Sequence, residues 1–396
     1  MATTPALESP ESDLSPTASK EVARMRTFSF AFYTTTAVVI SYFPLYFQDR
    51  GYSEQQIGIL YSIGPALAIF ANLLAGMASD RFRTIRKIMM ILLAGQLAML
   101  SLLFTSADFI AVCFIMAGFY FFQTPLNPLN DSLILLSVKH TGRKYPSIRI
   151  FGSIGFAVAA LVIGQFLKSS GSGATMVAGI VTIIISLGLS FTLKDYQQTS
   201  APKVQYSGFL KLVSKPDVII FFLLLLLLSI AHRMNDGFLA VAMRQMGADE
   251  SLVGMAWMVS AVSEIPVLFL LGKYGHKFKD LPLLAFAGLG YALRFWLLSR
   301  VEAPEWAVLI QALHSISFGV FFSTALRYMT HLIPDEFRAS GQALFAVIWT
   351  GIAGLLSGLI GGYVLEVFGR GTFFEAAAWL ALLGAAGFLI KHIRAK

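Results

Sequence analysis

Twelve long apolar runs fill almost the whole chain, and short polar segments separate them. A helix needs about 20 consecutive apolar residues to cross the hydrocarbon core of a bilayer. The pattern therefore predicts an all-α membrane protein with twelve transmembrane helices. The predicted helices occupy residues 27–49, 54–79, 88–106, 108–137, 147–168, 174–193, 218–245, 249–272, 281–300, 304–331, 339–366 and 370–391.

The composition excludes a water-soluble fold. Charged residues make up 13% of the chain, against roughly 25% in soluble domains, and the mean hydropathy is +0.71. The apolar runs leave no room for a separate enzyme domain, and the sequence has no His-Glu-x-x-His zinc motif. The single cysteine, Cys113, excludes a multi-cysteine metal site. We expect no enzyme activity, no metal and no cofactor.

Lysine and arginine are unevenly distributed between two sets of loops. The N-terminal segment, the even-numbered loops and the C-terminus carry 21 of the 30, whereas the odd-numbered loops carry 5. Because basic residues are enriched in cytoplasmic loops, we expect both termini in the cytoplasm and a multi-pass protein of the plasma (inner) membrane. The net charge of +8 then reflects topology, so we expect contact with membrane lipid and none with nucleic acid.

The longest polar connection divides the twelve runs into two sets of six. Residues 1–22 are rich in Ser, Thr, Pro and Glu, and we expect them to form a disordered cytoplasmic tail. An N-terminal six-helix half follows over 23–193. A cytoplasmic linker over 194–217 then leads to a C-terminal six-helix half over 218–396.

The two halves are related by an internal repeat. When the sequence is shifted by about 196 residues, the stretch from Gly51 to Tyr61 falls on the stretch from Gly247 to Trp257, with Gly and Glu at matching positions. The match continues without a gap, so that Gly76 falls on a second glycine. A parallel repeat of this kind is the plan of major facilitator transporters, and we expect that fold.

One loop carries a recognisable motif. The sequence from Gly76 through Asp80 and Arg81, followed by a basic cluster, resembles the loop signature of the major facilitator superfamily. The resemblance implies a gating role, because Asp80 can pair across the cytoplasmic end of the bundle and release when the halves move. Ordinary cytoplasmic loop charge is the alternative explanation.

Ionisable groups within the apolar runs are the candidates for function. Each costs about 2.5–3.5 kcal/mol to insert at the middle of a membrane helix, so such groups face a wet cavity or pair with one another. An ion pair that only holds helices together is the structural alternative. The candidates are Asp131, Arg149, His232, Arg233, Asp236, Glu264, Arg294, His314 and Arg327.

Several of these residues lie in motifs that resemble the lactose permease family. Asp131 with Arg149-Ile-Phe-Gly resembles the acid–arginine pair of that family, and Val-Ser-Glu264 resembles its substrate-binding carboxylate. Leu-Arg294 and Leu-His314 match the arginine and histidine of its proton-coupling cluster. The resemblance covers nearly the whole chain and implies that Asp131, Arg149 and Glu264 bind substrate, and that Glu264, Arg294 and His314 couple transport to protons.

Parts of the chain also resemble the phenylpropionate permease family. They include the stretch from Pro125 to Asp131, in which we count Asn127 as a substrate-binding residue. If the substrate is an aromatic carboxylate, we expect Arg149 or Arg294 to hold its anionic group. If it is a sugar, the carboxylate–guanidinium pair binds hydroxyls, and Trp257, Phe156 and Tyr120 are candidates to stack on the ring.

The chain departs from the lactose permease pattern at two places. Ser317 stands where that family has its proton-carrying glutamate, and the eleventh run has no basic residue at membrane depth. Asp236 therefore lacks its usual partner, and Arg233 on the preceding turn is the candidate replacement. Glu264 is the candidate proton carrier, and we assign Asp236 and Arg233 to the same coupling group.

Taken together, these residues predict a secondary transporter that works by alternating access. We expect a proton-coupled symporter of a small polar solute, most simply a sugar or glycoside, that uses the proton gradient and acts as a monomer. The alternatives are an aromatic carboxylate or nucleoside symporter and a proton-antiport exporter of sugars or drugs. A channel is disfavoured, because the two unequal halves carry scattered charge rather than a uniform pore lining.

Overall fold

The computed structural model describes residues 16–106, 108–195, 211–334 and 337–394, and in these ranges the regular structure is helical without any strand. The N-terminal half consists of α1 (Pro16–Asp49), α2 (Glu54–Phe82), α3 (Ile85–Leu103), α4 (Phe109–Gln123), α5 (Leu126–Thr141), α6 (Pro146–Ser170), η1 (Ser172–Ala174) and α7 (Thr175–Ser190). The C-terminal half consists of α9 (Pro216–Gln245), α10 (Glu250–Tyr274), η2 (Gly275–Lys277), α11 (Asp280–Arg300), α12 (Pro304–Ile310), η3 (Gln311–Leu313), η4 (Ser315–Gly319), α13 (Val320–Leu332), α14 (Arg338–Ala346), η6 (Val347–Ile352) and α15 (Ala353–Arg394).

These helices account for the twelve predicted spans. Helices α4 and α5 together form the fourth span, and α12 to α13 form the tenth. The apolar segment Ser340–Arg394 is far longer than a bilayer is thick. It is divided at Gly369, whose φ of +78° is not helical, into the eleventh and twelfth spans. The prediction of an all-α membrane protein is therefore confirmed.

The first helix begins earlier than the sequence predicted. Helix α1 starts at Pro16, inside the region expected to be a disordered tail. Val22 is buried, and Glu21 forms an ion pair with Lys194 at 2.8 Å, so packing and charge extend the helix beyond its apolar run. The rest of the predicted tail, residues 1–15, and most of the predicted linker, residues 196–210, lie outside the described residues.

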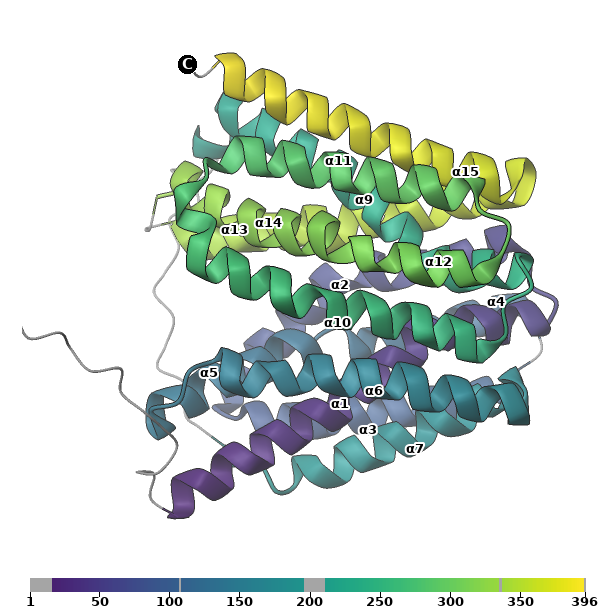
Figure 1. The fold of residues 1–396 in the computed structure, drawn as a ribbon. Helices are drawn as coiled ribbons and strands as arrows, with labels where there is room; N and C mark the ends of the chain where they lie inside the picture. Colours follow the sequence, from purple (N-terminus) through teal and green to yellow (C-terminus); the bar gives the residue numbers. More distant parts are fainter. Residues whose placement is uncertain (1–15, 107, 196–210, 335–336, 395–396) are drawn as a thin grey trace, which may run out of the picture.

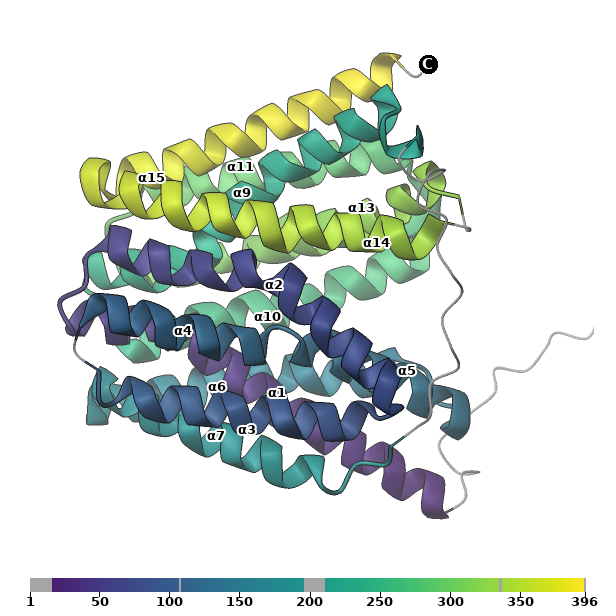
Figure 2. The same ribbon diagram turned by 180° about the vertical axis from the view of Figure 1, so that it is seen from behind.

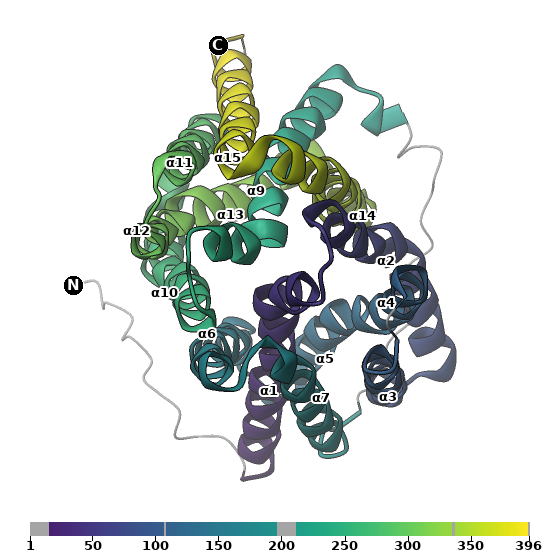
Figure 3. The ribbon, with the colours of Figure 1, turned by 90° about the vertical axis from the view of Figure 1, so that its right-hand side faces the viewer.

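The two halves lie side by side: in Figure 1, α3, α6 and α7 lie at the bottom, α9, α11 and α15 lie at the top, and α2 and α4 lie level with α10 between them. The start of α1 and the end of α15 lie at the same end of the bundle, and the view from behind shows the same arrangement (Figures 1 and 2). We call this end the terminus side. Figure 3 looks onto the opposite side, where α6 lies beside α10 and α2 lies near α15.

The halves are joined by polar contacts on the opposite side. Arg244 of α9 donates to Asp49 of α1 at 2.7 Å, and Lys168 of α6 forms an ion pair with Asp249 at 2.9 Å. Burial alone would raise the pKa of Asp249. The hydrogen bond from the Leu252 N–H and the Lys168 ammonium have the larger combined effect, so the pKa of Asp249 is lowered. The carboxylate thus stays charged near neutral pH, and these contacts close the opposite side.

Candidate functional site

A divided cavity lies between the two halves. One part has a volume of about 390 Å³ and the other about 250 Å³, which together match the size of small-molecule sites, roughly 300–1,000 Å³. Both parts are lined by Thr36, Ile40 and Asp236, so they meet at these residues. We call the larger part the amide compartment, after Asn72, Gln123 and Asn127 in its wall, and the smaller part the charged compartment, after Arg149, Asp236 and Glu264.

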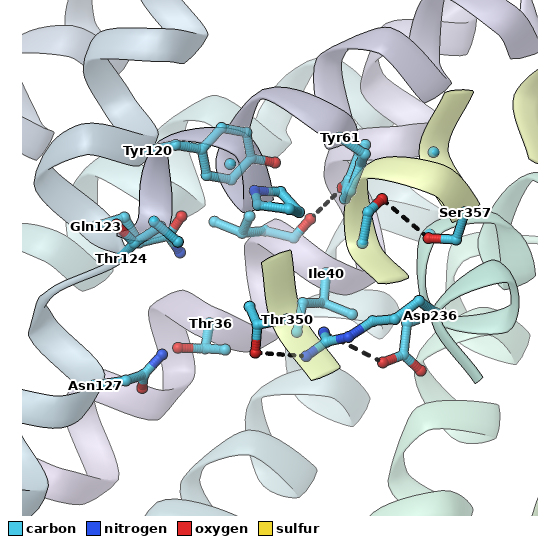
Figure 4. Close-up of a pocket in the computed structure, with 18 of the residues that line it drawn as sticks. Thr36, Ile40, Tyr61, Tyr120, Gln123, Thr124, Asn127, Asp236, Thr350 and Ser357 are labelled. Carbon is cyan, nitrogen blue, oxygen red and sulfur yellow. Dashed lines mark hydrogen bonds and ion pairs between the residues drawn. The ribbon is translucent and has the colours of Figure 1, made fainter. Parts of the chain in front are cut away.

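A break between two helices shapes the amide compartment. Helix α4 ends at Gln123 and α5 begins at Leu126, because Pro125 has no N–H to continue the hydrogen-bonded ladder. The break places Gln123, Thr124 and Asn127 in the wall. Figure 4 shows these three residues facing Asp236 and Thr350 across the compartment.

A hydrogen-bonded chain of three residues lies at the charged compartment. Arg294 approaches His314 with 2.8 Å between its NH1 atom and the ring Nδ1, and His314 Nε2 lies 2.8 Å from Glu264 Oε1. A guanidinium can only donate, so Nδ1 accepts and the proton of a neutral imidazole lies on Nε2. His314 therefore donates to the Glu264 carboxylate. The predicted coupling residues Glu264, His314 and Arg294 are brought together.

Arg294 is completely buried and lines neither compartment. Its second guanidinium nitrogen donates to Gln311, which also accepts from Ser260 at 3.3 Å. Within the described residues it forms no direct ion pair with a carboxylate, and His314 stands between its charge and Glu264. The expectation that Arg294 could hold a substrate anion is wrong, because His314 and Gln311 occupy its donors and separate it from the cavity.

A second imidazole–carboxylate pair lies on α9. His232 Nε2 is 3.1 Å from Asp236 Oδ2, whereas Arg233 NH1 is 3.8 Å from the same oxygen. His232 therefore lies closer to Asp236 than the expected partner Arg233 does. The sequence analysis named His232 among the ionisable candidates but gave it no role in binding or coupling. The signal was available, because residues four apart on a helix lie on the same face.

Aromatic rings hold the two histidines in place. The Phe318 ring stacks on His232 with 4.7 Å between ring centroids and on His314 with 5.0 Å. Trp349 stacks on His232 at 5.0 Å. Phe318 lies in the π-helical turn η4 and Trp349 in the π-helical turn η6. Such turns occur frequently at functional sites, because the extra residue turns side chains away from the regular helical positions.

The predicted acid–arginine pair forms, but only one member reaches the cavity. Arg149 Nε lies 3.5 Å from Asp131 Oδ1, and its guanidinium lies over the Tyr33 ring at 4.2 Å. Arg149 lines the charged compartment, whereas Asp131 lines neither compartment. On the loop before α6, burial and then the Asp131 carboxylate raise the pKa of Tyr145 to about 12, so this hydroxyl stays protonated beside the pair.

The remaining predicted site residues fall in two places. Phe156 and Trp257 line the charged compartment with 6.1 Å between ring centroids, and Asn127 lines the amide compartment. Asp80 and Arg81 are exposed at the terminus-side end of α2, after Gly76. The gating role of that motif stays a prediction.

The Asp195 carboxylate binds the N-terminal end of α3. It accepts the N–H groups of Ile85 at 3.1 Å and Arg86 at 3.3 Å. Thr84 also donates to it. A carboxylate at a helix N-terminus satisfies amides that have no partner within the helix, so this contact fixes the loop after α2 to the end of the N-terminal half.

Sequence reasoning missed most of the amide compartment. Asn72 and Thr350 are single polar residues within apolar runs, and Thr36 and Gln123 lie in short uncharged polar stretches, so no charge distinguishes them. In the part of the chain that the structure describes, no group of three His, Cys, Asp or Glu side chains is placed to hold a metal ion.

Comparison with known proteins identifies similar chains. The model of the MFS_1 like family matches residues 22–376. The maltose permease of Geobacillus stearothermophilus is 25% identical over 378 residues, covering 93% of this chain and 94% of the permease. The probable 3-phenylpropionic acid transporter of Escherichia coli (strain K12) is 24% identical over 360 residues, covering 88% and 92%.

The fold is also similar to a solved transporter. The crystal structure of nucleoside transporter NupG superposes with a TM-score of 0.82 at 17% sequence identity, covering 93% of this chain and 98% of that chain. At this identity the likeness concerns the fold alone.

Proposed function

The chain belongs to the MFS_1 like family and is a multi-pass membrane transporter of the major facilitator fold, and from this premise we propose that it is a proton-coupled symporter of a small polar solute. Its family and relatives are transporters rather than enzymes. The energy source in this proposal is the proton gradient, without a cofactor. The terminus side faces the cytoplasm and the chain acts as a monomer in the plasma membrane.

The observation that carries the proposal is the chain from Arg294 through His314 to Glu264. The Glu264 carboxylate lines the charged compartment and has 22% of its side chain accessible, so a proton can reach it from the cavity. His314 lies within hydrogen-bond distance of this carboxylate, and Arg294 contacts the other ring nitrogen of His314. Arrival or loss of a proton at Glu264 changes the charge of the wall, and in a symporter that change is linked to substrate binding.

The substrate in this proposal is a sugar, a glycoside or a nucleoside. Trp257 and Phe156 offer apolar ring faces, and the wall also carries amide and hydroxyl groups. A relative is named as a maltose permease and the similar structure as a nucleoside transporter. A second relative is named for 3-phenylpropionic acid, so an aromatic carboxylate remains the competing substrate.

The direct test uses purified protein in lipid vesicles with a pH-sensitive dye outside and no imposed gradient. Maltose, uridine and 3-phenylpropionate are added one at a time. We expect external alkalinisation with a hydroxylated solute, because a symporter carries protons inward with it. External acidification would instead support proton antiport and hence an exporter.

Replacing the proposed proton carrier should separate binding from coupling. In Glu264→Gln the amide cannot take up a proton, so we expect the pH response and uphill accumulation to be lost while exchange of bound solute continues. The control is Glu375→Gln on the opposite side, where the carboxylate only pairs with Arg300 at 2.7 Å. Proton-driven accumulation by Glu264→Gln at the level of the control would contradict the role of Glu264.

A further inference from the structure

Asp236 occupies a distinctive position in the cavity. Among the residues that the structure describes, it is the only ionisable side chain that lines both compartments, where they meet beside Thr36 and Ile40. Its Oδ2 atom is engaged by His232 and Arg233, and 20% of its side chain is accessible. The Oδ1 atom has no hydrogen-bond partner among the residues that the structure describes.

An ionised carboxylate oxygen without a partner requires a hydrogen-bond donor. A carboxylate only accepts, and leaving a buried acceptor unsatisfied is unfavourable. Rotation about the last bond of an aspartate side chain is soft, so a partial turn of the carboxylate can bring the buried Oδ1 atom toward the cavity while Oδ2 stays within reach of His232 and Arg233. A ligand at the junction that carries an O–H or N–H group supplies the missing hydrogen bond.

The wall offers no unpaired cation to a substrate anion. Arg149 is paired with Asp131 at 3.5 Å, and Arg233 is paired with Asp236 at 3.8 Å. With Glu264, the arginines and carboxylates that line the two compartments balance at two of each, and the two histidines of the wall, His232 and His314, each contact one of the carboxylates. A substrate carboxylate would have to displace one of these pairs and would lie near Asp236, whose charge has the same sign.

Polar atoms in the walls of both compartments also lack partners. Trp257 lines the charged compartment and Tyr120 lines the amide compartment, and the atoms concerned are the buried Trp257 Nε1, which only donates, and the buried Tyr120 hydroxyl. Neither has a hydrogen-bond partner within the described ranges. A solute that forms hydrogen bonds with both Trp257 and Asp236 must carry an acceptor for the first and a donor for the second. Hydroxyl and amide groups provide both, whereas a carboxylate provides acceptors only.

We propose that Asp236 is a substrate-binding residue that accepts a hydrogen bond from an uncharged, hydroxyl- or amide-bearing solute and thereby selects against carboxylates. The proposal rests on the proposed function of the chain as a transporter of a small polar solute. It moves Asp236 from the proton-coupling group, where the sequence placed it, to the substrate. His232 and Arg233 then act as positioning residues that hold Oδ2.

The test measures binding to the full chain in lipid nanodiscs by calorimetry. The probes are maltose, uridine and the matched pair 3-phenylpropionate and 3-phenylpropanamide, which share a skeleton and differ in that the first ends in an anionic, acceptor-only carboxylate and the second in a neutral amide with N–H donors. We expect the wild type to bind the amide at least about tenfold more tightly than the carboxylate. Equal or tighter binding of the carboxylate would overturn the proposal.

The variant Asp236→Asn tests the same residue from the protein side. Its amide directs its oxygen toward His232 and its NH₂ toward the cavity, so the amide-over-carboxylate preference should disappear and binding of the hydroxylated probe that the wild type binds best should weaken at least about tenfold. Asp217→Asn is the control, because Asp217 lies at the terminus-side end of the same helix, away from the cavity, and pairs with Lys391. Unchanged probe affinities in a folded Asp236→Asn protein would overturn the proposal.

Two readouts keep this inference separate from the proposed function. The wild-type comparison of the two phenyl probes does not depend on the variant being folded. The pH response in vesicles measures coupling independently of binding. Binding that follows the expected preference without any pH response contradicts symport but supports the role of Asp236, whereas a pH response with tighter binding of the carboxylate does the reverse.

Discussion

At the scale of residues, the structure shows how charges are tolerated at membrane depth. Among the described residues, the arginine and carboxylate side chains in the cavity wall are each engaged by a neighbour: Arg149 by Asp131, Asp236 by His232 and Arg233, and Glu264 by His314. An isolated charge at this depth is costly, so pairing is the condition for keeping it there. The same pairing decides which atoms are left for a substrate.

Replacing Arg149 by lysine tests the geometry of one such pair. The guanidinium contacts Asp131 and also lies over the Tyr33 ring. A lysine ammonium is a compact, non-planar group and cannot make both contacts at once. We expect transport by Arg149→Lys to fall at least about tenfold. Uptake of labelled solute into vesicles measures this, and Arg24→Lys on the exposed surface of α1 is the control. Full activity of Arg149→Lys would remove Arg149 from the site.

At the scale of elements, the repeat seen in the sequence recurs in backbone conformation. Gly51 and Gly247, which the shift of about 196 residues superposes, have φ of +83° and +89°. Glycine adopts such angles without steric cost. Each is followed by a helix whose first turn is capped by a side chain, from Ser53 in α2 and from Asp249 in α10. The matching sequence motifs therefore form the same turn and helix cap in both halves.

Small residues on the eleventh span allow close contact between the halves. The sequence places Gly351, Gly354, Gly358, Gly361 and Gly362 at spacings of one to four residues. Helix α15 meets α2 along this stretch, and a Cβ atom added to Gly362 would lie 2.8 Å from the Glu54 carbonyl oxygen. Closure of the opposite side therefore depends on the absence of side chains here.

The variant Gly362→Leu should open the opposite side. We expect a longer distance between spin labels placed at Ser169 and Glu305, in a Cys113→Ser background, because leucine cannot fit against α2. Gly188→Leu is the control, since a Cβ atom there meets nothing within 4 Å. An unchanged label distance in Gly362→Leu would show that this helix contact does not hold the halves together.

At the scale of the whole molecule, the arrangement fits one state of an alternating-access cycle. The halves meet on the opposite side through the ion pairs of Asp49 with Arg244 and of Lys168 with Asp249. The amide compartment extends from this closure toward the terminus side, since its wall includes Asn72 on α2 and Ala346 on α14. Release of the ion pairs is required before the cavity can face the opposite side.

Removing the ion pair between halves should shift the balance of states. Exposed ion pairs contribute about 0.2–1 kcal/mol, so we expect Arg244→Gln to raise the population open on the opposite side about 1.4- to fivefold. The spin-label distances between Ser169 and Glu305 measure it. The control is Arg300→Gln, which breaks a pair with Glu375 inside one half. Equal populations in the two variants would show that Arg244 does not hold the closed state.

The sequence by itself determined the number of spans and the repeat. Both are visible as patterns along the chain. The thickness of the bilayer sets the length of each apolar run, and the repeat places glycines and helix caps at matching positions in the two halves. It also identified Glu264, Arg294 and His314, since charges inside apolar runs stand out. The start of α1 was misplaced because burial of Val22 is a tertiary effect.

Only the tertiary structure decided which of these groups meet and which reach the cavity. The rotation of each helix brings Glu264 against His314 and leaves Asp131 behind Arg149. The π-helical turns that carry Phe318 and Trp349 have no periodic signal in the sequence. The two compartments exist because six-helix halves pack together, and packing between distant segments is what local hydrophobic patterns do not contain.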